Sequence, residues 1–240
     1  MLATSQQLVV ITGASKGLGK ALAIQLAQAG YRLALVARDQ QLLQQLAQQL
    51  HQQYQVSASV FAADLTQHQQ LSSLFQQIEQ QCGPIEILIN NAGTGFFKPF
   101  LQHSIAEHQA IIDLNFTALV HSCYAVLPAM QQRQRGIIFN IASDVSERPQ
   151  ANMAVYSASK FAVRGFSLSL LREVKQYGIK VSCINPGIID TCFNGNIPGH
   201  KAAEDALQVA QVAELIQQLL QQPAHLLIDE ITLHPPTQDF

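Results

Sequence analysis

Apolar residues along this chain follow two alternating patterns. Short apolar runs, rich in β-branched residues, have the length of β-strands and lie at 8–12, 32–37, 56–62, 85–90, 136–142, 179–185 and 226–233. Between them, apolar residues recur every three or four positions, which predicts helices near 17–29, 40–53, 67–82, 104–132, 153–177 and 204–221. The strands are nearly all apolar, as they are in a sheet covered by helices on both faces.

This alternation predicts right-handed βαβ crossovers and therefore a doubly wound parallel sheet of seven strands. Neither a break in composition nor a repeat of roughly 20–50 residues divides the chain of 240 residues. We therefore expect one α/β domain over residues 1–240, with helices on both faces of the sheet.

Composition changes this picture little. Charged residues make up only 12% of the chain, and glutamine supplies polar surface in runs such as "QQLLQQLAQQL". Leucines interrupt these runs at helical spacing, which indicates a neutral solvated helix face rather than a disordered tract. The net charge of −2 argues against nucleic acid or an anionic membrane as a partner.

The sequence also predicts no targeting segment and no metal site. No apolar run approaches the roughly 18 residues that span a bilayer. The start of the chain, "MLATSQQLVVITGAS", lacks a basic leader and a cleavage site, so we expect a cytoplasmic protein. The four cysteines show no CxxC or CxxH spacing, and the histidines pair with neither cysteine nor carboxylate, so we expect reduced thiols and no metal.

The first strand runs into a glycine-rich turn, "TGASKGLGK", with glycines at 13, 17 and 19. Glycines at a strand-to-helix junction allow a tight turn and close approach of the backbone to a pyrophosphate at the helix N-terminus. A P-loop does not fit, because Ala21 follows Lys20 and no glycine lies five residues before Gly19. A glycine-rich turn without a ligand remains the alternative at this point.

The second predicted strand ends in "LVARDQ". An NAD site places an acid near this position on the ribose hydroxyls, but Asp39 comes one or two positions late and equally suits a helix cap. Arg38 and Lys16 would instead supply cations for a 2′-phosphate, which favours NADP(H) over NAD(H). The alternative is that Arg38 only extends its charged end into solvent at a strand end.

Two further strand ends carry polar residues. Asp64, in "AADLTQ", is placed to reach an adenine amino group and is equally suited to a turn. The fourth strand ends in "NNAG", residues 90–93, where small residues allow close approach and asparagine side chains can tie adjacent loops; an ordinary turn explains the same residues.

Together with "DLNFTALV", "NIAS", "YSASK" and "NPGIIDT", these motifs resemble the short-chain dehydrogenase/reductase family in its compact branch. The motifs span residues 12–191 in the family's order, so the resemblance covers essentially the whole chain. It implies a Rossmann-type fold, with a cofactor half at about 1–150 and an active-site and substrate-loop half at about 151–240. It implies cofactor-binding residues at Gly13, Ser15, Lys16, Gly17, Leu18, Gly19, Arg38, Asp64, Leu65, Asn91, Ala92, Gly93, Tyr156, Lys160, Pro186, Gly187, Ile189 and Thr191.

The resemblance also implies a catalytic set of Asn115, Ser143, Tyr156 and Lys160. Hydride transfer to a carbonyl leaves charge on oxygen, so a proton donor is needed beside it. Tyrosine has a pKa near ~10, and a cation ~4 Å away at an effective dielectric near ~20 would lower it by about three units. Lys160 lies one helical turn from Tyr156 and can supply that charge, whereas Ser143 would orient the substrate oxygen.

Asparagine is unfavourable within a helix. The resemblance implies that Asn115 interrupts its helix and holds a water molecule that connects to the lysine. The segment after "NPGIIDT", residues 192–205, is expected to close over substrate as a lid, with Phe193 contacting substrate. Together with Phe96, Phe97 and Phe100 it predicts an apolar pocket. A steroid, an acyl thioester, a small aldehyde or ketone, and a hydroxy acid all stay open as substrates.

We therefore predict an NADP(H)-dependent oxidoreductase that acts on a carbonyl or secondary alcohol of a small molecule. The family pairs subunits through the long helices near 104–132 and 153–177, so a homodimer or homotetramer is expected. The ending "DEITLHPPTQDF" differs from that of carrier-protein ketoacyl reductases and argues against an acyl-carrier partner. The alternative function is a dinucleotide-binding regulator without turnover; an epimerase or dehydratase is less consistent with the glycine spacing and length.

Overall fold

The structure, a computed structural model, describes residues 4–202 and 204–238. Seven strands form one sheet in the order β3-β2-β1-β4-β5-β6-β9, and every neighbouring pair is parallel. The strands are β1 (Leu8–Thr12), β2 (Arg32–Ala37), β3 (Ala58–Ala62), β4 (Ile85–Asn90), β5 (Gly136–Ile141), β6 (Ile179–Pro186) and β9 (Glu230–Leu233). The expected seven-stranded, doubly wound sheet is confirmed. The strand order reverses between β1 and β4, where ligands bind in such sheets.

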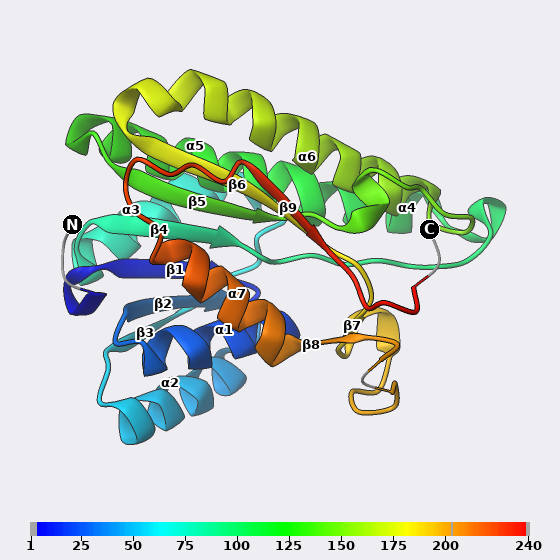
Figure 1. Ribbon diagram of the computed structural model, residues 1–240, viewed down its shortest axis with the longest axis horizontal. Helices are drawn as coiled ribbons and strands as arrows, with labels where there is room; N and C mark the ends of the chain where they lie inside the picture. The colour runs from blue at the N-terminus through cyan, green and yellow to red at the C-terminus, as the bar shows by residue number, and fades with distance from the viewer. Residues whose placement is uncertain (1–3, 203, 239–240) are drawn as a thin grey trace.

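Helices cover both faces of the sheet (Figure 1). One face carries α1 (Gly17–Gln28), α2 (Gln40–Tyr54) and α7 (Val209–Leu220). The other carries α3 (Leu71–Cys82), α5 (Ala118–Arg133) and α6 (Ala154–Val174), with α4 (Ile105–Ile112) beside α6.

Strand β1 shows how the apolar runs produce two cores. Its residues point alternately to opposite faces, so Val9 and Ile11 pack with α1 and α7, whereas Leu8 and Val10 pack with α3 and α5. All of β1 is buried. A strand buried on both faces has no solvent side and therefore no polar alternation.

Three predicted boundaries differ from the structure. The helix expected at 104–132 is divided into α4, a π-helical turn at Asp113–Thr117, and α5. Strand β9 begins at Glu230 rather than at 226, because the backbone turns at Pro223–Leu226 and the apolar residues there are about two-fifths exposed. The helix expected from 204 begins at Val209, because β8 (Leu207–Gln208) pairs with β7 (Ile189–Asp190).

The continuous helical segment Ile105–Arg133 is long and apolar enough to cross a membrane by length and composition alone, contrary to our expectation that no segment would be. Its apolar residues have a place in the fold, because Ala118, Cys123, Val126 and Met130 belong to the core on this face of the sheet. The length and apolar composition of this segment are therefore explained by its packing into the core on this face of the sheet.

Candidate active site

The glycine-rich turn between β1 and α1 is shaped by contacts that only glycine allows. Gly13 and Gly17 have positive φ angles of 67° and 54°. A Cβ atom on Gly13 would lie 2.9 Å from the Cα of Ala92, and one on Gly19 would collide with the carbonyl oxygen of Gly13. The turn is therefore a compact backbone cradle at the start of a helix, and its shape fits a pyrophosphate.

The loop after β4 is tied to this turn. The side chain of Asn91 donates to the carbonyl oxygen of Thr12 (2.9 Å), and the amides of Asn91 and Ala92 both donate to the Thr12 hydroxyl (3.0 and 3.1 Å). The prediction that the asparagine side chains tie adjacent loops is confirmed for Asn91. Asn90 instead donates to Asn140 in the neighbouring strand (2.9 Å).

The loop after β6 closes the opposite side of the cradle. A Cβ on Gly17 would lie 3.7 Å from the Cβ of Thr191, so Thr191 stands directly beside the glycine turn. The Thr191 hydroxyl accepts from the amide of Phe193 (3.2 Å), and Ile189 pairs with Leu207 in the small β7–β8 sheet. The sequence-predicted cofactor residues of the first, fourth and sixth strand ends thus lie close together at one edge of the sheet.

Charged residues at the ends of β2 and β3 have defined partners. Asp39 caps α2 by accepting from the amide of Leu42 (3.0 Å), so it acts as the helix cap that the sequence left open. Asp64 accepts from the backbone and hydroxyl of Thr66 (3.0 and 2.8 Å), which forms a turn. The Thr66 backbone bond lowers the pKa of Asp64, and the charge of Arg38 contributes in the same direction. Arg38 and Lys16 are exposed.

Tyr156 and Lys160 lie at the start of α6, and both are buried. The ammonium of Lys160 donates to the carbonyl oxygen of Ile141 at the end of β5 (2.9 Å) and lies 5.8 Å from the centre of the Tyr156 ring. Burial lowers the pKa of Lys160 to about 8. Burial also raises the pKa of Tyr156 well above its ordinary value.

The last result corrects an expectation. Lys160 was expected to lower the pKa of Tyr156, but in the protein alone desolvation outweighs any such effect, and the negative charge of Asp144 adds to the rise. The hydrogen bond with Ser143 works in the opposite direction.

Asn115 occupies the π-helical turn between α4 and α5, and the predicted interruption of the helix is therefore confirmed. Its side-chain amide donates to the carbonyl oxygen of Thr94 (2.9 Å) and to Ser159 (3.1 Å), and its oxygen accepts from the amide of Thr94 (2.7 Å). A Cβ on Gly93 would lie 3.3 Å from Asn115 and 3.7 Å from Lys160. Asn115 therefore holds the loop after β4 next to the lysine.

Ser143 lies two residues after the end of β5 and caps the short 3-10 helix Asp144–Ser146. It is hydrogen-bonded to Tyr156, and its hydroxyl donates to the carboxylate of the next residue, Asp144 (3.0 Å). Asp144 is buried and also accepts from the side chain of Gln238. The sequence analysis identified neither Asp144 nor Gln238. The sequence does carry a local signal for Asp144, because an acid follows the serine directly. Gln238 lies 94 residues from Asp144, and only the fold brings the two together.

Aromatic side chains cover Tyr156. The ring centroids of Phe97 and Phe193 lie 5.3 and 5.8 Å from that of Tyr156. Beside them, a small cavity of about 30 Å³ is lined by the tyrosine and by residues from two segments, Phe96–Ile111 and Asn152–Val155. The expected apolar surroundings are present at Phe97 and Phe193, whereas Phe100 is mostly exposed and stacks on His108 (4.9 Å).

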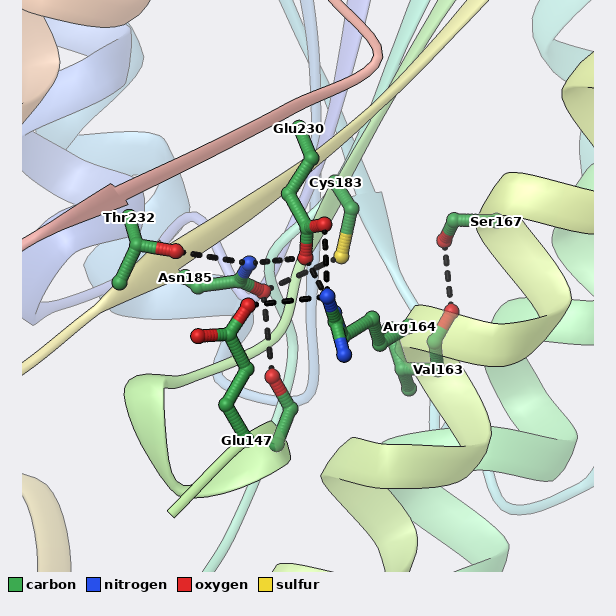
Figure 2. A network of polar contacts seen from close by, with 9 residues as sticks. Glu147, Val163, Arg164, Ser167, Cys183, Asn185, Glu230 and Thr232 are labelled. Atoms are coloured by element: carbon green, nitrogen blue, oxygen red, sulfur yellow. Dashed lines mark hydrogen bonds and ion pairs between the residues drawn. The ribbon is translucent and has the colours of Figure 1, made fainter.

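A second polar network connects α6 to β6 and β9 (Figure 2). Arg164, one turn beyond Lys160, forms an ion pair with Glu147 (2.9 Å) and a two-point contact with Glu230 of β9. Asn185 of β6 donates to Glu230 (2.6 Å). Arg164 thus joins the helix of the tyrosine to β9 and to the turn that follows Ser143.

Comparison with known proteins identifies the family of this chain. The family model for short-chain dehydrogenases matches residues 7–202. An uncharacterized oxidoreductase of Staphylococcus saprophyticus is 31% identical over 235 residues, which cover 98% of this chain and 100% of that protein.

Two solved structures share the fold over nearly their whole length. An alcohol dehydrogenase from the archaeon Thermococcus sibiricus, in complex with 5-hydroxy-NADP, superimposes with a TM-score of 0.92 at 29% identity and covers 97% of this chain and 98% of its own. A serine dehydrogenase in its closed form with NADP⁺ gives a TM-score of 0.89 at 28% identity, with 98% and 97% coverage. This chain belongs to the short-chain dehydrogenase family and is an NAD(P)-dependent oxidoreductase.

Proposed function

We propose that the protein is an NADP(H)-dependent reductase of ketones or aldehydes that also oxidises the corresponding alcohols. The observation that carries the proposal is the convergence of Tyr156, Ser143 and Lys160 beside the glycine cradle. Small-molecule substrates are typical of the family. Two of the solved relatives are an alcohol dehydrogenase and a serine dehydrogenase, which supports a hydroxyl-bearing substrate here.

The cofactor would lie in the crevice between the glycine turn and the loop after β6, where the nicotinamide supplies the hydride. The cradle of Gly13, Gly17 and Gly19 would hold the pyrophosphate and Thr191 the facing end. Asp39 is engaged in the cap of α2, whereas Arg38 and Lys16 are exposed at the same edge. Cations without an acid directed at the ribose support NADP(H) over NAD(H).

In the reductive direction, Tyr156 would donate its hydroxyl proton to the substrate oxygen while Ser143 orients that oxygen. A raised pKa keeps Tyr156 protonated at neutral pH, which suits a proton donor. Lys160, with a pKa of about 8, is mostly charged at pH 7 and stabilises the phenolate that remains after transfer. Asn115 holds the loop after β4 against the lysine.

We also propose that the protein assembles as a homodimer or homotetramer through the long helices. Tyr124 on α5 is 73% exposed and Phe161 on α6 is 43% exposed, which places large apolar side chains on the outer faces of both helices. Size-exclusion chromatography with light scattering measures the mass in solution; a monomer at micromolar concentration would contradict this part of the proposal.

A screen of NADPH and NADH absorbance tests the function against aldehydes, ketones, acetoacetyl thioesters and hydroxy acids. We expect turnover with NADPH in preference to NADH, and a preference for NADH would contradict the role of Arg38. Tyr156→Phe should bind NADPH as the wild type does and lose roughly 10²–10⁴-fold in kcat, because it lacks the proton donor. Tight binding of NADPH without turnover on any substrate would favour a regulatory protein instead.

A further inference from the structure

The segment after β9 returns to the active site and places Gln238 there. The amide nitrogen of Gln238 donates to Oδ2 of Asp144, and its Oε1 accepts from the backbone amide of Ile188 (2.9 Å). Ile188 belongs to the loop after β6 that forms one side of the cofactor crevice, and Asp144 follows Ser143. One side chain therefore joins the two halves of the site.

The position of Gln238 is fixed by its own neighbourhood. The backbone N–H of Gln238 donates to the carbonyl oxygen of Pro235 (3.1 Å), which closes a turn. The hydroxyl of Thr237 donates to the carbonyl oxygen of Glu204 (2.7 Å) and to the side chain of Asp205 (2.9 Å), at the end of the substrate-loop segment. The segment is thus attached both to the loop that would cover the substrate and to the carboxylate beside Ser143.

Asp144 needs the donor that Gln238 supplies. The residue is 6% exposed, and its two oxygens receive different donors, Ser143 on Oδ1 (3.0 Å) and Gln238 on Oδ2. A buried carboxylate without hydrogen bonds is strongly destabilised. If the Ser143 hydroxyl turns from Asp144 toward a substrate oxygen, Gln238 remains as the donor that holds the carboxylate in place.

We propose that Gln238 is a positioning residue for the reaction. Its side-chain amide holds Asp144, and through Asp144 the Ser143 hydroxyl, at a fixed position relative to the Ile188 backbone. This inference rests on the proposed function, since it concerns the orientation of the serine that receives the substrate oxygen. Gln238 itself contacts neither Ser143 nor Tyr156 through a hydrogen bond among the described residues.

Three variants test the proposal. Gln238→Ala removes both contacts and should lower kcat roughly tenfold, the cost of one hydrogen bond to a charged group. Gln238→Glu keeps an acceptor for Ile188 but loses the donor and faces the Asp144 carboxylate, so kcat should fall at least as far while the KM for NADPH stays near the wild-type value. The double variant Asp144→Asn with Gln238→Glu reverses the donor and the acceptor and should recover kcat to within roughly threefold of the wild type.

Gln218→Ala on the exposed face of α7 is the matched control, because it removes the same side chain far from the crevice. Thermal unfolding of each variant separates loss of fold from loss of positioning. A Gln238→Ala protein with wild-type kcat would refute the proposal. So would a double variant no faster than Gln238→Glu alone. If the wild-type protein turns over no substrate, the proposed function fails, and the role of Gln238 in the reaction fails with it.

Discussion

The two loops beside the proposed cofactor site are held in place in different ways. The glycine turn after β1 is held by its own backbone, since an added side chain on Gly19 would meet the carbonyl oxygen of Gly13. The loop after β6 is held from a distance, because a side chain on Gly187 would meet the side chain of Gln238. A backbone oxygen cannot move without reshaping the turn, whereas the end of a glutamine side chain can rotate away.

The largest effect should therefore come from Gly19→Ala. The new methyl group has to displace the backbone of the cradle, so we expect NADPH affinity to fall roughly a hundredfold, as active-site displacements of about 1 Å do. Fluorescence titration of NADPH measures the affinity. Gly165→Ala is the control, because a Cβ there meets nothing within 4 Å; it lies within α6 and should bind NADPH normally and gain up to about 1 kcal/mol of stability. An unchanged NADPH affinity of Gly19→Ala would contradict the view that the glycine turn is held by its own backbone.

Gly187→Ala should have a smaller effect of a different kind. The methyl group displaces the Gln238 side chain, so kcat should fall roughly tenfold, as in Gln238→Ala, while NADPH affinity changes little. The double variant of Gly187→Ala and Gln238→Ala should be no slower than either single variant, because both remove the same contacts. Additive losses in steady-state kinetics would show that the loop after β6 is also constrained by its own backbone.

The smallest expected effect is a change of kcat with pH. Lys160 has a pKa of about 8, so it carries its charge below this pH and loses it above. In the proposed mechanism reduction needs that charge beside Tyr156, so kcat for the carbonyl substrate should decline as pH rises through about 8. Lys160→Arg remains charged at every accessible pH and should show no decline in that range, even if its kcat is lower overall. The same inflection in both proteins would assign the titration to another group.

The same contrast explains what the sequence could predict. Strands, sheet and glycine turn follow from local pattern, because apolar runs and glycines act through their own backbone neighbours. The convergence of Asn115, Ser143, Tyr156 and Lys160 followed from the order of the motifs, and the π-helical turn at Asn115 agrees with its expected interruption of the helix.

The missed features all depend on residues far apart in the chain. Gln238 lies 94 residues from Asp144, and Arg164 lies 66 residues from Glu230. No periodicity relates such pairs, since the chain path between them determines whether they meet. The direction of the Tyr156 pKa was also mispredicted, because helical spacing gives the distance to Lys160 but not the burial that opposes the charge.

The position of Thr191 against Gly17 has a consequence for the life of the protein in a cell. A dinucleotide held between these residues would bridge segments from opposite ends of the chain, and such a ligand stabilises the whole folded state in proportion to the logarithm of its concentration. Because chaperones and proteases act on the unfolded fraction, the protein should resist proteolysis best when its cofactor is plentiful. Enzyme abundance would then follow the supply of the reductant that the enzyme consumes.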